Sequence, residues 1–456
     1  MSLSANHSRS WIFVLSPLLG LLLLYYLFRS SPDAYTESSP IREEHEQITY
    51  LPPATNPPSP QRESHCHFLR GMEDVFVVLK TGATEVQDKL PVHLQTTLRC
   101  LPSYAVFSDY EEDISGVRTH DTLRNVRNET KHSQPDFRIY NRLSTEGRQG
   151  LLAVDWKDDV EGPFGKPNIP GWRLDRWKYV PMIDEAIKIR PDAKWYVFLE
   201  PDSYMVWPNL LAWLARFDAA KPYYIGSPMQ IGDVIFAYSG SGIILSNPAM
   251  RRVSKYTARR SKEIDEYTSN NWSGDCVLGK VLRDVGVPLV WSWPMQLTSR
   301  VWETDHFSEG YGRRPWCHPA VSYHGMEPRD IQDFYDFEQD WFRNGKNSLL
   351  LHGDVFRKLI QNETLTEQED WDNMSSEPVS EQIGNPLFLS ASDCAGHCAR
   401  DPECLQYSFG NGKCQISRSI IKGTPKAGVH SGWMPYRIQT YLKYMIPCGR
   451  VDYVLE

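Results

Sequence analysis

Short apolar runs alternate with segments of helical periodicity across residues 65–345. Three runs rich in β-branched and aromatic residues predict strands: 74–80, 104–107 and 195–199. Three further segments predict helices: 90–101, 177–189 and 208–217. This alternation indicates an α/β fold, with a mostly parallel sheet and helices on both of its faces. In such sheets, ligands bind beyond the carboxyl ends of the strands.

The N-terminal part of the chain follows a different pattern. Residues 11–28 form an uncharged apolar run, which predicts a transmembrane signal-anchor preceded by a cytoplasmic tail at 1–10. A cleaved signal peptide is the alternative, but the run is followed by Arg29 and Ser30 rather than by a small-residue cleavage site. Residues 29–64 are rich in proline and serine and predict an extended stem.

Sequons and cysteines indicate on which side of the membrane the body lies. The four Asn-x-Ser/Thr sequons after the apolar run begin at Asn128, Asn271, Asn362 and Asn373. Of nine cysteines, five crowd near the C-terminus without a Cys-x-x-Cys zinc motif, which favours disulfides and an oxidising compartment. Because nine is odd, one cysteine stays free or pairs between chains. We therefore expect a type II membrane protein of the Golgi, or of another secretory-pathway membrane, with a lumenal body.

Composition narrows the class of partner. Hydrophobic residues make up 41% of the 456-residue chain and charged residues 23%, as expected for folded domains. The formal net charge is −8, which argues against a nucleic-acid-binding protein.

Candidate chemistry begins where the predicted strand 195–199 ends. Glu200 and Asp202 follow it directly and would lie together at the edge of the sheet. Two carboxylates there can hold Mn²⁺ or Mg²⁺, and such a cation neutralises a nucleotide diphosphate. The alternative is a surface loop that happens to carry two acids.

The segment 195–204 resembles the metal-binding acidic motif of glycosyltransferase family 31, which includes Fringe and the core 1 β1,3-galactosyltransferases. Further similar segments follow in the family's order, over residues of about 70 to 330: 74–81, 106–109, 207–211, 223–226 and 238–246. The resemblance implies a nucleotide-diphospho-sugar transferase fold of the GT-A type, in a catalytic domain at 65–375. The chain departs from the family at Glu200 and at Pro201, which lacks both a carboxylate and a backbone donor.

The same resemblance assigns the metal ligands. Asp202 aligns with the acid that contacts the metal, and Glu200 stands beside it. Residues 320–326 are similar to the family's late Ser-aromatic-His strand, which implies that His324 is a third ligand. Imidazole suits Mn²⁺ beside oxygen ligands. A structural histidine on an apolar strand is the alternative.

Asp275 is the candidate catalytic base. Residues 274–282 resemble the family's segment that carries this base, and an inverting transfer needs a group that takes the proton of the acceptor hydroxyl. The alternative is that Asp275 caps the helix after Ser273. The sequon at Asn271 would place a glycan close to this group.

Donor and sugar contacts complete the expected site. Asp109, Lys178 and Glu200 are candidate contacts to the UDP-sugar, although a solvated helix lysine is the alternative for Lys178. The small residues of the loop formed by Gly240, Ser241 and Gly242 would allow its backbone to approach a sugar, and an ordinary turn is the alternative.

The C-terminal cysteines belong to a second module at 385–450. The spacing of Cys394, Cys398, Cys404 and Cys414 resembles that of a PAN/apple domain, a small disulfide-rich α+β module. The resemblance implies the pairs Cys398–Cys404 and Cys394–Cys414. It leaves Cys448 without a local partner. Such a module would hold the acceptor or pack on the catalytic domain.

The expected function is a metal-dependent, inverting transfer of galactose, in β1,3 linkage, from UDP-galactose to an O-linked glycan on a glycoprotein. One alternative is a Fringe-like N-acetylglucosaminyltransferase, and another is a fungal-type enzyme with an O-mannosyl acceptor. Pro201 motivates a third alternative, a catalytically silent glycan-binding protein. A homodimer is compatible with each of these.

Overall fold

The computed structural model describes residues 69–156, 169–343, 349–379, 390–445 and 448–455. Within these ranges, no helix combines the length and the apolar character needed to cross a membrane. The predicted tail, membrane span and stem all lie outside the described residues.

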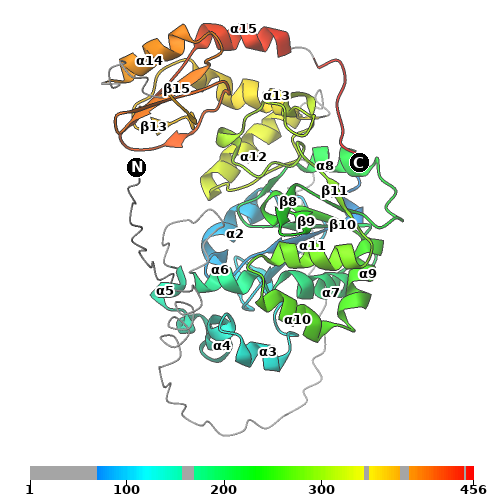
Figure 1. The fold of residues 1–456 in the computed structure, drawn as a ribbon. Coiled ribbons are helices and arrows are strands. Elements are labelled where there is room, and N and C mark those ends of the chain that lie inside the picture. Colours follow the sequence, from blue (N-terminus) through cyan, green and yellow to red (C-terminus); the bar gives the residue numbers. More distant parts are fainter. Residues whose placement is uncertain (1–68, 157–168, 344–348, 380–389, 446–447, 456) are drawn as a thin grey trace, which may run out of the picture. The chain divides into compact units, whose positions relative to one another are not determined.

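An eight-stranded sheet forms the centre of the part of the chain that precedes residue 343 (Figure 1). Across the sheet the order is β11 (Leu289–Trp291), β7 (Tyr224–Gly226), β10 (Ile243–Ser246), β5 (Trp195–Leu199), β1 (Val75–Lys80), β2 (Tyr104–Ser108), β4 (Val117–Asp121) and β3 (Asp113–Ile114). Strand β1 runs parallel to both β2 and β5, whereas β10 runs antiparallel to β5 and β7. The three predicted strands are confirmed as β1, β2 and β5, and the mostly parallel sheet is consistent with a GT-A fold.

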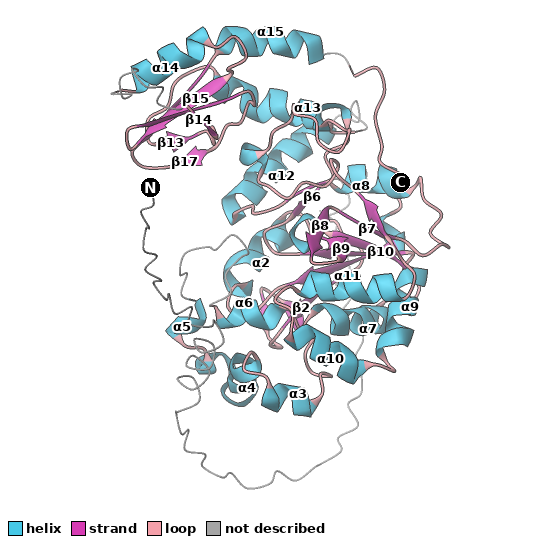
Figure 2. Cartoon of the chain, in the orientation of Figure 1, coloured by secondary structure: helices cyan, strands magenta, loops and turns pink. Residues whose placement is uncertain are grey.

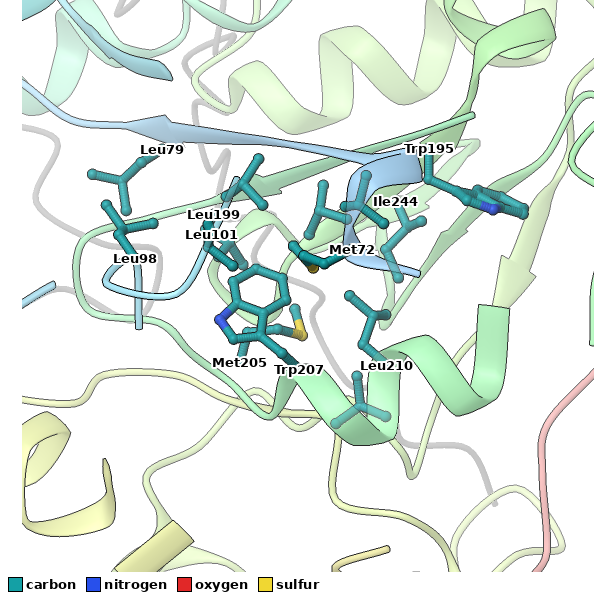
Figure 3. Packing of buried hydrophobic residues seen from close by; sticks show 14 of the residues in the cluster. Met72, Leu79, Leu98, Leu101, Trp195, Leu199, Met205, Trp207, Leu210 and Ile244 are labelled. Atoms are coloured by element: carbon teal, nitrogen blue, oxygen red, sulfur yellow. The ribbon is translucent and has the colours of Figure 1, made fainter. Parts of the chain in front are cut away.

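Helices cover both faces of the sheet. Because alternate residues of a strand point to opposite sides, the strands contribute residues to two separate cores. Val75, Val77 and Leu79 of β1 belong to one core with helices α2 (Val86–Gln95) and α8 (Trp207–Leu214). Figure 3 shows part of this core, with Trp207 and Leu210 beside the strands. Phe76 and Val78 of β1 pack in a second core with α7 (Tyr179–Ile189), α9 (Asn247–Thr257) and α11 (Gly274–Asp284), which lie together in Figure 2.

The helix predicted over 90–101 needs correction. It begins at Val86 and ends at Gln95, because the chain then closes a turn in which Leu98 N donates to His93 O at 2.8 Å. The other two predicted helices are present as α7 and α8, with ends shifted by at most three residues. Further elements of this region include α3 (Asn128–Ser133), α4 (Phe137–Glu146), α5 (Ala153–Trp156), α6 (Pro170–Asp175), α10 (Ser261–Ser269), β8 (Pro228–Ile231) and β9 (Val234–Ala237).

The C-terminal region is rich in disulfides. Helix α14 (Ala391–Arg400) packs on an antiparallel sheet with the order β14 (Glu377–Pro378), β16 (Lys413–Ser417), β15 (Gln406–Gly410) and β18 (Val429–Trp433). The bonds Cys394–Cys414 and Cys398–Cys404 are the two pairs that the PAN/apple resemblance implies. Cys448 pairs with Cys317, 131 residues earlier, which the sequence did not indicate. Cys100 is also disulfide-bonded, and among the described cysteines Cys276 is free and buried.

Near the boundary, each region contains a segment that packs in the other region. Strand β14 and the pair formed by β13 (Trp371–Asp372) and β17 (Thr424–Pro425) place residues before 385 in the small module. Conversely, the C-terminal tail packs on the catalytic core, where Val454 is buried and its carbonyl accepts a hydrogen bond from Trp213 Nε1 at 2.6 Å. A third core joins them, containing residues of α12 (Pro328–Phe342), α13 (His352–Val355) and α15 (Pro435–Met445).

The asparagines of the four sequons differ in their exposure. Asn128 and Asn362 are exposed, and Asn271 is half-buried with its side-chain amide bonded to Tyr267 O at 2.7 Å. Asn373 is fully buried, and its amide nitrogen donates to Tyr407 O and Gly432 O at 3.0 and 3.2 Å. Asn373 thus ties together two strands of the small sheet, and a glycan on this side chain would require that packing to open.

Candidate functional site

The candidate site is assembled by a short antiparallel pair beyond the end of β5. Strand β6 (Tyr204–Met205) pairs with β12 (Ser322–Tyr323), and Tyr204 lies opposite Tyr323. After β12 the chain passes close to Asp202, whose carbonyl oxygen accepts a hydrogen bond from Met326 N at 2.8 Å. Asp202, just before β6, is therefore brought beside His324, just after β12, although more than a hundred residues separate them.

Glu200, Asp202 and His324 form the cluster expected of a divalent-metal site. Each offers one ligand atom, and these atoms all lie within 4.8 Å of one another. His324 Nε2 is 3.6 Å from Asp202 Oδ1, which is buried and has no hydrogen-bond partner among the described residues. A buried carboxylate oxygen is costly when it is left unpaired, and a cation would satisfy it. Two carboxylates and one imidazole fit Mn²⁺ or Mg²⁺, with the imidazole favouring Mn²⁺.

Glu200 also belongs to a buried charge network. Its Oε1 accepts a hydrogen bond from Tyr179 OH at 2.5 Å and lies 3.0 Å from Lys80 Nζ. Burial acts to raise the pKa of Glu200, but the attraction of Lys80 and His324 and the hydrogen bonds from Tyr179 and Ser239 together outweigh it and hold the pKa below its usual range. Lys80 pairs in turn with Asp175 at the end of α6. Neither residue was predicted, although a lysine that ends a fully buried strand was a signal for one of them.

Small residues in the loop after β9 fit the imidazole ring. A Cβ atom added at Gly240 would lie 2.3 Å from His324 Cδ2, so only glycine permits this contact. The Gly240 carbonyl accepts a hydrogen bond from Ser203 Oγ at 2.7 Å, and the Ser241 carbonyl accepts one from Gln296 Nε2 at 2.8 Å. Gly242 has a positive φ of 94°. The close backbone approach that the sequence suggested is made to His324, and the loop positions this side chain.

Asp275 lies in the first turn of α11, behind the same loop. Its Oδ2 accepts hydrogen bonds from the backbone N–H and the hydroxyl of Ser239, both at 3.1 Å. Ser273 is the N-cap of the helix, which corrects the idea that Asp275 caps it. Burial raises the pKa of Asp275; the hydrogen bonds from Ser273 and Ser239 oppose this, and the negative charge of Glu200 adds to it. A raised pKa makes a carboxylate a better proton acceptor.

Lys178 and Asp109 are buried rather than exposed to a ligand. The Lys178 ammonium lies 3.0 Å from Asp109 Oδ2 and 2.6 Å from Asp175 Oδ1, and it donates to Thr81 O at 2.7 Å. Its three donors are therefore engaged, so the solvated-lysine alternative was wrong. Asp109 Oδ1 accepts from Ala83 N at 2.7 Å. Both residues connect the ends of β1 and β2 to α6 and α7, and through Asp175 they join the network of Lys80 and Glu200.

An α/β sheet whose carboxyl edge gathers two carboxylates, an imidazole and a buried aspartate is consistent with the GT-A fold. The family model described as Fringe-like matches residues 70–340, which is more than half of the chain. The chain therefore belongs to the Fringe-like family. Membership implies glycosyltransferase activity, with a nucleotide-sugar donor and a glycan acceptor.

Proposed function

We propose that this protein is an inverting β1,3-galactosyltransferase that uses UDP-galactose, Mn²⁺ and an O-linked glycan acceptor on glycoproteins. The observation that carries the proposal is the cluster of Glu200, Asp202 and His324, with its unpaired buried oxygen, at the sheet edge where the family binds its donor. Asp202 and His324 would be the principal ligands, because Glu200 is already partly neutralised by Lys80. The cation, when bound, supplies positive charge to the diphosphate leaving group.

In the proposed reaction, Asp275 takes the proton of the acceptor hydroxyl. The acceptor oxygen forms a bond to the anomeric carbon while the bond from that carbon to the UDP oxygen breaks, and UDP leaves with the electron pair. Ser239 orients the base through two hydrogen bonds to one of its oxygens. The other oxygen accepts from Ser273 Oγ and from Cys276 N. Rotation of the Ser273 hydroxyl would free this oxygen for the acceptor.

Pro201 keeps the choice of donor open. It is buried, and its carbonyl oxygen lies 2.9 Å from His93 Nε2, so the loop keeps its shape without the acid that the family carries there. The loss of that acid favours testing UDP-N-acetylglucosamine as a second donor and an O-mannosyl acceptor of the fungal type as a second acceptor. A silent glycan-binding protein is the remaining alternative, and the retained cluster with Asp275 argues against it.

Three further proposals concern the location, the small module and the oligomeric state. The apolar run, the stem and the exposed sequons at Asn128 and Asn362 support a type II Golgi membrane protein with a lumenal catalytic domain. The two nested disulfides support a PAN/apple-like module. A homodimer is the third proposal, and sedimentation of the lumenal part would test it.

Metal dependence tests the proposed function. We expect EDTA to abolish release of UDP from UDP-galactose in the presence of acceptor, and Mn²⁺ to restore it. Asp202→Ala should abolish both activity and calorimetric Mn²⁺ binding, because it removes the unpaired ligand oxygen. Asp233→Ala, at a side chain that is 86% exposed, is the matched control and should behave as wild type. Full activity in EDTA would refute the proposal.

A further inference from the structure

A cavity of about 250 Å³ opens beside the segment that carries His324. Its wall includes Thr298 and Ser299, whose backbone contacts this histidine: His324 Nδ1 lies 3.4 Å from Thr298 O, and His324 N donates to Ser299 O at 3.2 Å. The cavity thus adjoins the metal cluster but contains none of its ligands. Its volume is slightly below the ~300 Å³ at which the usual range for ligand sites begins. It suits one sugar ring better than a nucleotide.

One wall of the cavity is aromatic. Trp293 lines it, and the backbone of Gly310 lies so close that an added Cβ would come within 3.0 Å of the indole. The Tyr311 ring stands edge-on to Trp293 at a centroid distance of 5.6 Å and is 71% exposed. An indole offers a flat apolar face with a polar edge, and the C–H face of a sugar ring is complementary to it.

The other walls carry hydroxyls and carboxylates: Thr298, Ser299, Thr304, Ser308, Asp305 and Glu309. No basic side chain occurs among the described lining residues. Asp305 is already engaged, because its Oδ1 accepts from Phe307 N at 2.8 Å and its Oδ2 from Ser419 Oγ at 2.7 Å. Glu309 is exposed, and within the described part of the chain no hydrogen bond or ion pair holds its carboxylate. Glu309 is therefore available to a ligand.

We propose that this cavity is a subsite for one neutral monosaccharide unit of the acceptor glycan. The sugar ring would pack on Trp293 and donate its hydroxyls to Glu309. The acidic lining repels phosphate, sulfate and sialic acid, so the diphosphate of the donor is excluded and charged acceptor sugars are disfavoured. This inference rests on the glycosyltransferase function proposed above.

Binding of simple sugars to the full-length protein tests the subsite directly. With UDP and Mn²⁺ present, methyl glycosides of N-acetylgalactosamine, galactose and mannose are titrated by saturation-transfer NMR, with galactose 6-sulfate as the anionic probe. At least one neutral glycoside should bind, and the sulfated sugar should bind at least about tenfold more weakly, a difference of about 1.4 kcal/mol. Trp293→Ala should weaken binding of the neutral sugar by a similar factor, and Trp293→Phe should retain most of the wild-type affinity.

Substitutions at exposed positions keep the test independent of folding. Glu309→Gln should reduce the discrimination against sulfate, and Glu309→Lys should reverse it. Tyr436→Ala, which removes a remote aromatic side chain that is 82% exposed, is the matched control and should bind both probes as wild type does. UDP affinity, measured by calorimetry, should be the same in all of these proteins.

The outcomes distinguish the subsite from the function. If the wild type transfers sugar but Trp293→Ala and Glu309→Lys bind every glycoside as it does, the subsite is refuted and the transferase proposal stands. If glycosides bind as described but no UDP-sugar is hydrolysed or transferred, the proposed function fails and the cavity remains a sugar-binding site. Stronger binding of the sulfated sugar by the wild type would also overturn the inference.

Discussion

Asp275 is a buried carboxylate held by donors from Ser239, Ser273 and Cys276. If it is the base, Asp275→Asn should lower turnover by about 10²–10⁴-fold, the usual contribution of general-base catalysis. UDP affinity should change little, because the base acts on the acceptor. The measurement is UDP release under saturating donor, together with calorimetric UDP binding.

The structure also sets the control for that substitution. Asp284→Asn makes the same chemical change at the exposed far end of α11 and should leave turnover unchanged. Ser273→Ala removes the true N-cap and should cost about 1 kcal/mol of stability. Wild-type turnover in Asp275→Asn would rule out the base assignment.

At the scale of elements, the loop after β9 sets the position of the imidazole. Gly240→Ala would push a methyl group into His324, since its Cβ would lie 2.3 Å from the ring. Displacing the ring should weaken Mn²⁺ binding by at least tenfold, and the overpacking should cost about 1–3 kcal/mol of stability. Gly449→Ala adds the same methyl group where no atom lies within 4 Å, and it should change neither quantity.

Helix α12 carries a carboxyl group that makes stability depend on pH. Burial raises the pKa of Glu338 to about 8, although the hydrogen bond from Tyr204 opposes this. Because the pKa in the folded state exceeds the ordinary value of 4.5, stability is fully present below pH 4.5 and falls as the pH rises towards 8. The slope is up to about 1.4 kcal/mol per pH unit.

Glu338→Gln should remove that part of the slope, because glutamine stays neutral and still accepts the Tyr204 hydroxyl. Urea unfolding at pH 5 and at pH 8 provides the comparison. Glu369→Gln, at an exposed side chain, should keep the full wild-type slope. Equal slopes in wild type and Glu338→Gln would contradict the assignment.

The hydrophobic pattern along the chain was sufficient to predict some strands, but it could not predict contacts between distant segments. The apolar runs located β1 and β5 because every residue of these strands is buried. The family resemblance brought Glu200, Asp202 and His324 into one site. The partners of Lys178 and Cys448, and the burial of Asn373, depend on contacts between distant segments, for which the sequence carries no local signal. The pairing of Lys80 with Asp175 across 95 residues likewise depends on such a contact, although the position of Lys80 at the end of a buried strand was a local signal.

At the scale of the molecule, the small module supports the wall of the proposed sugar cavity. Ser419 donates to Asp305, and Gly423 N donates to Trp302 O at 2.8 Å. The ammonium of Lys422 lies 4.8 Å from the centroid of the Trp302 ring. These contacts support a positioning role for the module on the acceptor side of the site.

The disulfide Cys317–Cys448 should contribute more stability than the local ones. Its sequence separation is 131, against 6 for Cys398–Cys404, and the chain-entropy gain grows with loop length. Replacing both cysteines of a pair by alanine should cost about 3–5 kcal/mol for the long loop and about 2 kcal/mol for the short one. Calorimetric melting of the two double variants makes the comparison, and equal losses would show that loop entropy does not dominate.

The Cys317–Cys448 disulfide also determines the outcome of backbone cleavage. Any single break in the backbone between Cys317 and Cys448 leaves both pieces covalently joined. The tail beyond Cys448 is seated against Trp213 of the catalytic core, so the last residues of the chain stay with its middle. Proteolysis between these cysteines would therefore create new ends without creating a second molecule, and a reducing agent would be needed to separate the fragments. On a gel, such a nicked enzyme would look intact until it was reduced.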